Sequence, residues 1–427
     1  MTNAVADRVD KFTGLYSNHA LVNDGRNDGG RGKYIHIRGR TRDSVEKSQG
    51  LGEPTPTTFG TTLFSEVCTI HPSGNVLLSP LSVFKALALV EEGATIGSEN
   101  CSQLKRVLGS SSTIERTEDE DNEDSDVQLI MASSVWGDRL KQSYVDAVMS
   151  EHSAEALPMP MRFTPIDEWI EDKTNGMIKG FLGDEKIPAD IVALLVNAVY
   201  FKGQWTHEFN PRHTIDGEFV HRNNSMVPAR FMAATHMMDV IKDSPALGGA
   251  SAVVLDYGKQ SSDGEPTEFT SLFILPASSD NDSMSDVVNG LKSQSISELL
   301  GDASFTGVHL ELPRFRLKFG PTEFGPPSLK QALENMGMID AFNISISNKF
   351  NEMSNNPTLF VGDVWHGAAM EVTEEGTEAS GTTVVPIRGR SASLRLLFDR
   401  PFVVAVVHRS TGTPIFLGRV EEPELDF

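Results

Sequence analysis

The chain has 427 residues, of which 39% are hydrophobic and 22% charged, a balance that suits a folded core rather than a disordered chain. Its formal net charge of -22 argues against a nucleic-acid backbone or an anionic membrane as the main partner. No stretch reaches the roughly 18 consecutive apolar residues that a membrane-spanning helix needs.

Residues 1–55 differ from the rest of the chain. They are rich in glycine and mixed in charge, without sustained periodicity, which is typical of a flexible tail. We expect a single folded domain over residues 56–427. The first residues contain no apolar run of signal-peptide length, so we expect a cytoplasmic or nucleocytoplasmic protein, with unconventional secretion left open.

Beyond the tail, apolar residues recur at regular spacing. Helical spacing predicts helices over 57–69, 82–92, 98–108, 166–181 and 328–336. Continuous or alternating apolar runs predict strands over 127–136, 191–201, 251–257, 268–275, 308–319 and 402–407. Helices and strands mix without strict alternation, which predicts an α+β fold with antiparallel or mixed sheets.

Motifs for catalysis and for metal binding are absent from the sequence. There is no CxxC pair, HExxH helix, GxSxG elbow or phosphate-binding loop, which argues against a hydrolase. The 11 histidines show no spacing of metal ligands. The acidic run over residues 110–126 also lacks regular ligand spacing, and we interpret it as a solvated loop. We therefore expect no enzyme activity, no cofactor and no metal.

The segment over residues 374–391 combines the features of a loop and of a strand. Two internal glycines, a proline and terminal arginines are typical of an exposed loop. Read with period two, however, one set of side chains is small or apolar, as in a strand with one buried face: Thr377, Ala379, Gly381, Thr383, Val385 and Ile387. The pattern fits a segment that is a loop in one state and a strand in another, and it also fits a mobile surface loop.

A series of motifs from about residue 57 to residue 423 resembles the serpins, a family of serine protease inhibitors, in the family's order. The motifs are Asn-Val-Leu-Leu-Ser-Pro-Leu-Ser at 75–82, Leu-Val-Asn-Ala-Val-Tyr-Phe-Lys-Gly-Gln-Trp at 195–205, Asp-Val-Trp-His-Gly-Ala at 363–368, Glu-Glu-Gly-Thr-Glu-Ala at 374–379, Asp-Arg-Pro-Phe at 399–402 and Phe-Leu-Gly-Arg-Val at 416–420. The resemblance implies the serpin fold, with three β-sheets, about eight to nine helices and an exposed reactive loop at about residues 374–397.

The resemblance also implies a mechanism. A serpin offers its reactive loop as a substrate, forms an acyl-enzyme with the protease, and then inserts the cut loop into its main sheet. We therefore expect a monomeric suicide inhibitor that forms a covalent complex with a trypsin-like serine protease. The hinge of the loop has the residues that insertion requires: Glu374, Gly376, Thr377, Ala379, Ser380, Gly381 and Thr382.

The family's usual spacing predicts which bond the protease cuts. Counts forward from Glu374 and backward from Pro401 meet at the Arg390–Ser391 bond. An arginine suits a protease whose specificity pocket contains a carboxylate, because the guanidinium pairs with it in two hydrogen bonds. Arg388 is the competing cleavage site, and an arginine-specific cysteine protease such as a metacaspase is the competing target.

The resemblance further implies a polar cluster beneath the main sheet, where its strands part, formed by Ser79, Ser82, Asn197 and His366. Trp205 should lie near the point where the loop inserts. Two residues depart from the family pattern. Gly367 occupies the position of a lysine that usually follows the histidine, and Pro386, which cannot donate to a sheet, lies in the stretch that inserts.

Two further alternatives concern function and activation. A non-inhibitory serpin, acting as a carrier or chaperone, often has bulky or charged residues in the hinge, whereas the hinge residues here are small. The acidic run occupies the place of a helix that is basic in heparin-activated serpins. We therefore do not expect heparin to act through that region.

Overall fold

A computed structural model describes most of the chain after the N-terminal region. The described residues are 55–109, 126–174, 176, 179–180, 182–187, 193–259, 267–319, 328–376 and 394–425. They belong to one compact unit that spans Gly52–Phe427. The predicted tail over residues 1–55 lies, except for Thr55, outside the described residues.

The described residues form eight α-helices and fourteen strands. The helices are α1 (Pro56–Ile70), α2 (Pro80–Glu92), α3 (Glu99–Leu108), α4 (Gln142–His152), α5 (Thr164–Lys173), α6 (Asn281–Ser293), α7 (Ile296–Gly301) and α8 (Lys330–Asn335). The strands are β1 (Val76–Leu78), β2 (Val127–Gly137), β3 (Glu155–Pro158), β4 (Ala193–Gly203), β5 (Ile215–Val220), β6 (Met226–Ser244), β7 (Ala250–Asp256), β8 (Phe269–Leu275), β9 (Ser304–Pro313), β10 (Phe315–Phe319), β11 (Asp363–Val372), β12 (Leu394–Leu397), β13 (Phe402–His408) and β14 (Thr413–Val420).

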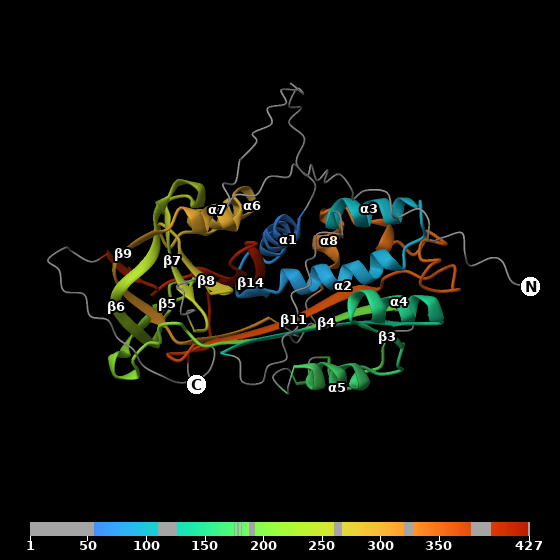
Figure 1. Cartoon of the computed structure of the whole chain (residues 1–427), viewed down its shortest axis with the longest axis horizontal. Helices are drawn as coiled ribbons and strands as arrows, with labels where there is room; N and C mark the ends of the chain where they lie inside the picture. The colour runs from blue at the N-terminus through green and yellow to red at the C-terminus, as the bar shows by residue number, and fades with distance from the viewer. Residues whose placement is uncertain are drawn as a thin grey trace, which may run out of the picture. The chain divides into compact units, whose positions relative to one another are not determined.

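The smaller sheet has five strands in the order β10-β11-β4-β2-β3. Its two central strands, β11 and β4, are parallel neighbours, and they run side by side through the middle of Figure 1. β2 pairs with β4 in the antiparallel sense along the whole of β4. The sheet is therefore mixed, as the sequence predicted.

The larger sheet has nine strands and is built around the 19-residue strand β6. The first part of β6 pairs with β5, its middle pairs with β9, and its last part pairs with β7. The continuous strand joins two groups of strands, β5-β6-β9-β12 and β1-β14-β13-β8-β7, that would otherwise be separate sheets. Together with the five-stranded sheet, these groups correspond to the three sheets expected from the sequence.

The five-stranded sheet has helices on both of its faces, and this explains why most residues of β4 are apolar. Leu194, Val196 and Ala198 belong to a cluster with Ile166 and Ile170 of α5. The intervening side chains of β4 face α2, which lies on the opposite side of the sheet from α5 (Figure 1). A strand buried on both faces needs apolar residues at successive positions.

Most predicted elements are confirmed, and the errors have local causes. The helix predicted over 82–92 begins at Pro80, because a proline without an N–H fits the first turn of a helix. The helix predicted over 166–181 ends at Lys173, before Gly176, which has a φ of +75°. The strand predicted over 308–319 is wrong: it divides at Arg314 into β9 and β10, which belong to different sheets.

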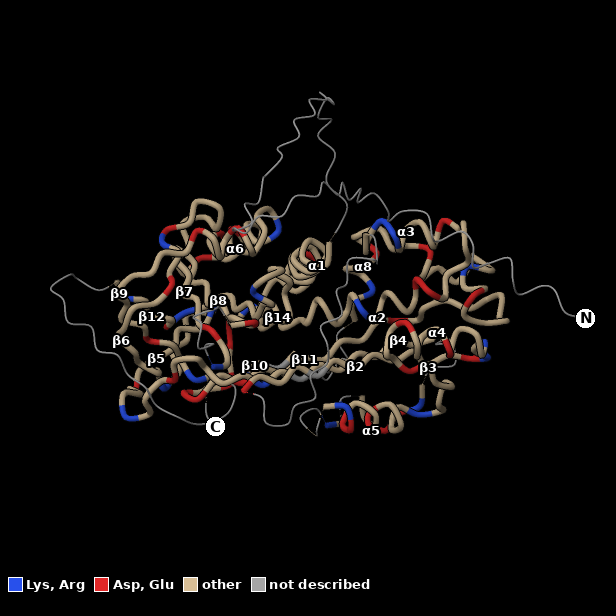
Figure 2. Tube along the Cα trace, viewed as in Figure 1, with Lys and Arg blue, Asp and Glu red and all other residues tan. Residues whose placement is uncertain are grey.

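Acidic and basic residues are interspersed along the described chain rather than gathered into one basic stripe (Figure 2). Several pair across elements, as Arg409 does with Asp256. Among the described residues, no helix has the length and apolar character required to cross a membrane.

Candidate functional site

The facing edges of β4 and β11 are paired over only part of their length. Register pairs join residues 363–367 of β11 to residues 194–198 of β4. Beyond them, residues 199–203 of β4 pair with β2 alone, and residues 368–372 of β11 pair with β10 alone. We call the region between these two unpaired edges the β4–β11 slot. It presents strand edges on both sides to which a further strand can hydrogen-bond.

The chain turns sharply where β11 ends, at the mouth of the slot. The N–H of Thr373 donates to the carbonyl of Gly376 at 3.0 Å, and the N–H of Gly376 donates back at 3.3 Å. Gly376 has a φ of +119°, and a Cβ atom there would lie 2.4 Å from the carbonyl oxygen of Gly203. Both the backbone conformation and the lack of space therefore require glycine at this predicted hinge position.

The segment that follows β4 holds the start of the hinge through three hydrogen bonds. The N–H of Trp205 donates to the carbonyl of Glu375 at 3.3 Å, and that of Phe209 donates to the carbonyl of Glu374 at 2.9 Å. The indole N–H of Trp205 donates to the carbonyl of Thr373 at 3.0 Å. The indole is buried and stacks on Tyr257 with ring centroids 4.5 Å apart. Trp205 thus lies at the mouth of the slot, as expected.

The side chain of Glu374 ties the hinge to both sheets. Its carboxylate accepts a hydrogen bond from the hydroxyl of Thr214 at 2.7 Å and lies 3.4 Å from Nε of Arg314. Thr214 immediately precedes β5, and Arg314 is the residue between β9 and β10. The carboxylate is nearly buried, so its charge depends on these two partners.

His366 lies in β11 and is completely buried. The backbone N–H of Ser79 donates to its Nε2 at 2.9 Å, which places the ring proton on Nδ1. Nδ1 has no hydrogen-bond partner among the described residues. Burial lowers the pKa of His366 from 6.5 to about 4, so the imidazole is neutral near pH 7.

Asn197 stands opposite His366 in the register of β4 and β11. Its amide nitrogen donates to the carbonyl of Ser82 at 3.0 Å and to the hydroxyl of Ser133 at 2.9 Å. The hydroxyl of Ser82 in turn donates to the Asn197 amide oxygen. The four residues predicted for the cluster, Ser79 among them, therefore come together, and they link α2 to the two strands that border the slot.

Residues 377–393, most of the predicted reactive loop, lie outside the described residues. This applies to the predicted scissile bond, Arg390 and Ser391, to the departure Pro386, and to the hinge residues Thr377, Ala379, Ser380, Gly381 and Thr382. The predicted loop limits, 374–397, need one correction: residues 394–397 form β12, which pairs with β9 in the parallel sense. The loop therefore ends before Leu394, because the backbone of these residues is fixed in the larger sheet.

A cluster of polar side chains fixes β12, which follows the predicted loop, to β9. Nε of Arg395 donates to the buried carboxylate of Glu311 at 2.9 Å. Nε2 of His309 lies 3.0 Å from the same carboxylate oxygen, and the other ring nitrogen of His309 lies 2.6 Å from the hydroxyl of Thr235. The described residues on either side of 377–393 are thus held in place, by Glu374 on one side and by Arg395 on the other.

Sequence analysis missed several of these residues. Ser133, Thr214, Arg314 and Glu311 belong to no recognised motif, and each reaches its partner only because distant strands lie side by side. The sequence carries one signal near Arg314: the alternation of apolar residues over 308–319 changes phase at Pro313–Arg314, although we predict a single strand there.

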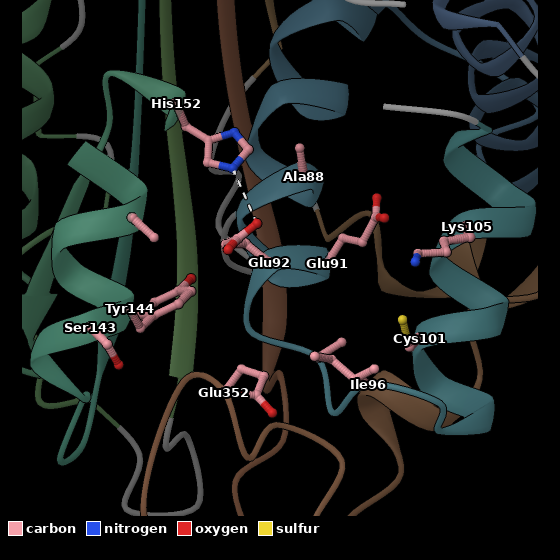
Figure 3. Close-up of a pocket in the computed structure, with 12 residues that line it drawn as sticks. Ala88, Glu91, Glu92, Ile96, Cys101, Lys105, Ser143, Tyr144, His152 and Glu352 are labelled. Carbon is pink, nitrogen blue, oxygen red and sulfur yellow. Dashed lines mark ion pairs between the residues drawn. The ribbon is translucent and has the colours of Figure 1, made fainter. Parts of the chain in front are cut away.

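A separate hollow of about 370 Å³ lies between α2, α3 and α4, away from the slot (Figure 3). Charged side chains of both signs line it, among them Glu91, Glu92, Lys105 and His152. Burial raises the pKa of Glu91 and lowers that of His152, whose Nε2 lies 3.9 Å from Glu92. The sequence predicted no site here, because these residues come from three helices.

Comparison with known proteins shows the family of this chain. A family model described as Serpin (serine protease inhibitor) matches residues 54–423. The chain belongs to the serpin family. Antithrombin-III of Mus musculus is 29% identical over 381 residues, which cover 83% of this chain and 77% of that protein. Corticosteroid-binding globulin of Oryctolagus cuniculus is 30% identical over 393 residues, which cover 87% and 95%.

A solved structure agrees with the fold of this serpin. The native state of the thermophilic serpin tengpin superposes with a TM-score of 0.70 at 24% identity, covering 86% of this chain and 93% of that one. The predicted fold class, an α+β serpin fold with three sheets and about eight to nine helices, is therefore confirmed, and the described residues form eight α-helices.

Proposed function

We propose that this serpin inhibits a trypsin-like serine protease as a suicide substrate that is cleaved at Arg390–Ser391. The β4–β11 slot is the observation that carries the proposal. Because β4 and β11 are parallel, a chain that turns back after β11 runs antiparallel to both strands. The turn over residues 373–376 already reverses the chain at the mouth of the slot, where Gly376 bridges to Gln204.

The hydrogen bonds that an inserted strand would form with β4 and β11 would help to drive insertion of the loop. Residues 199–203 and 368–372 each present one unpaired edge. A strand between them would form on the order of ten hydrogen bonds, each contributing about 0.5–1.5 kcal/mol net, or roughly 5–15 kcal/mol in all. Further insertion must separate the pairs over 363–367, where the His366 and Asn197 cluster holds the sheet closed.

The chemistry at the bond follows from the substrate role. The protease serine attacks the carbonyl carbon of Arg390, the peptide bond to Ser391 breaks, and the new amine leaves with a proton from the protease's histidine. The acyl-enzyme is then joined to the end of a strand that can insert. Insertion carries the protease away from the loop's original position before water completes the hydrolysis.

A gel assay tests the proposal. The full chain is incubated with trypsin and separated under denaturing conditions, and we expect a band near the combined mass. Arg390→Glu should abolish the band, whereas the matched variant Arg388→Glu should retain it. Clean cleavage after Arg390 without an adduct would exclude inhibition. Loss of the adduct only in Arg388→Glu would show that the protease cuts after Arg388 instead.

The same assay separates the alternative functions. An adduct with an arginine-specific cysteine protease, such as a metacaspase, and none with trypsin would favour that target class. A carrier or chaperone function, for which the relationship to corticosteroid-binding globulin is the supporting observation, predicts cleavage without an adduct. Heparin should not accelerate adduct formation, because residues 110–126 are acidic. The intracellular location and the monomeric state stay predictions.

A further inference from the structure

Two histidines that are far apart in the sequence lie side by side near the mouth of the slot. His207 belongs to the segment between β4 and β5, and His236 belongs to β6. Their ring centroids are 5.7 Å apart, and the ring planes make an angle of 84°. The short 3₁₀ helix of this segment, Pro211–His213, also packs against β6.

The backbone holds both imidazoles in the same protonation form. Nδ1 of His207 lies 2.9 Å from the carbonyl oxygen of Thr206, and Nδ1 of His236 lies 2.9 Å from that of Met237. A carbonyl can only accept, so each Nδ1 must donate, and a neutral ring then carries a lone pair on Nε2. Neither Nε2 has a hydrogen-bond partner among the described residues. Histidines that bind metal ions are commonly fixed in this way.

Burial supports the neutral form of His236. It lowers the pKa of the imidazole, and the nearby His207 lowers it further, while the hydrogen bond to Met237 acts in the opposite direction. A histidine that is neutral near pH 7 does not need to lose a proton before it binds a metal ion.

We propose that His207 and His236 together bind a divalent transition-metal ion, with Zn²⁺ as the expected ion. With a Zn–N bond of about 2.1 Å and a ring radius of about 1.1 Å, two imidazoles on one tetrahedral ion have centroids about 5.2 Å apart, and on a linear one about 6.4 Å. The observed 5.7 Å lies between these values. No group of three potential ligands occurs among the described residues, so within this part of the chain the site has two protein ligands.

The position of the ion connects it to the hinge. His207 lies between Trp205 and Phe209, whose N–H groups hold the carbonyls of Glu375 and Glu374. An ion shared with His236 would tie this segment to β6 and so stabilise the mouth of the slot in its present arrangement. This consequence rests on the proposed inhibitory function, and it predicts that Zn²⁺ slows loop insertion. The binding itself does not depend on that function.

Calorimetry tests the site directly. Zn²⁺ is titrated into the full chain and into His207→Ala, His236→Ala and the matched control His213→Ala, which removes an exposed histidine from the same segment. We expect the first two substitutions to weaken one Zn²⁺ equivalent by about ten-fold or more. The control should leave it unchanged, and Mg²⁺, which prefers oxygen ligands, should not compete.

Two results would overturn the site: no Zn²⁺ binding by the full chain, or binding that neither substitution weakens. His207 is exposed, so His207→Ala should fold, and its melting temperature in EDTA verifies this. Zn²⁺ binding without a protease adduct would retain the site and reject the inhibitory function. An adduct with no Zn²⁺ binding would reject the site and retain the function.

Discussion

The buried imidazole of His366 should make the closed sheet sensitive to acid. Its pKa is lowered from 6.5 to about 4, so between these values the unfolded chain binds a proton that the folded chain excludes. Stability contributed by the neutral ring is therefore complete above about pH 6.5 and is lost as the pH falls toward 4. Linkage gives a loss of about 2 kcal/mol between pH 7 and pH 5 from this residue alone.

His366→Gln tests this magnitude. The amide oxygen of glutamine can accept the hydrogen bond from the N–H of Ser79, but the side chain does not titrate. We would measure the urea concentration at the midpoint of native-state unfolding at pH 7 and at pH 5. Converted to a free energy with the slope of the unfolding curve, the loss of stability from pH 7 to pH 5 should be about 2 kcal/mol larger for the wild type than for the variant.

The other histidines do not affect the comparison between the wild type and His366→Gln. Burial also lowers the pKa of His71, His152 and His236, but these residues are common to both proteins. His213→Gln, which changes an exposed histidine, should retain the wild-type response. Equal losses of stability in the wild type and in His366→Gln would refute the reasoning.

Three further substitutions test the anchors of the loop. Gly376→Ala places a Cβ against the facing strand at a positive φ, and should lower the melting temperature by an amount equivalent to about 1–3 kcal/mol; an unchanged melting temperature would contradict the strained turn. Glu374→Gln removes the charge that pairs with Arg314 and should lower the free energy of unfolding in urea by about 1–3 kcal/mol; an unchanged free energy would mean that the pair contributes nothing. Arg395→Ala removes the ion pair between β12 and Glu311 and should lower the melting temperature by an amount equivalent to about 0.2–1 kcal/mol; an unchanged melting temperature would mean that Glu311 does not hold β12.

The sequence predicted individual helices and strands better than it predicted which strands pair with one another. β4 was recognisable because both of its faces are covered, which requires apolar residues at successive positions. The strand predicted over 308–319 shows the limit of such patterns. Apolar residues alternate at even positions in β9 (Val308, Leu310, Leu312) and at odd positions in β10 (Phe315, Leu317, Phe319), so the alternation changes phase where the backbone leaves one sheet and joins the other. The alternation predicts both strands, but it does not indicate which sheet each strand joins.

The residues of the functional site show the same difference between local motifs, which the sequence reveals, and distant partners, which it does not. Resemblance placed Ser79, Ser82, Asn197, His366 and Trp205, because they belong to short motifs that can be read along the chain, and they do lie at the slot and its mouth. The partners of Glu374 were not predictable. Thr214 and Arg314 have no motif of their own, and their role exists only because two sheets bring them to one carboxylate.

The sequence by itself determined the family, the hinge composition and the candidate bait at Arg390, because each is encoded in neighbouring residues. Only the tertiary structure decided that β4 and β11 pair along half of their edges, which leaves a slot for another strand. Only the tertiary structure likewise shows that the rings of His207 and His236, which are far apart in the sequence, lie 5.7 Å from each other. Patterns along a chain report local periodicity, whereas unpaired edges and side-chain pairs depend on which distant segments the fold brings together.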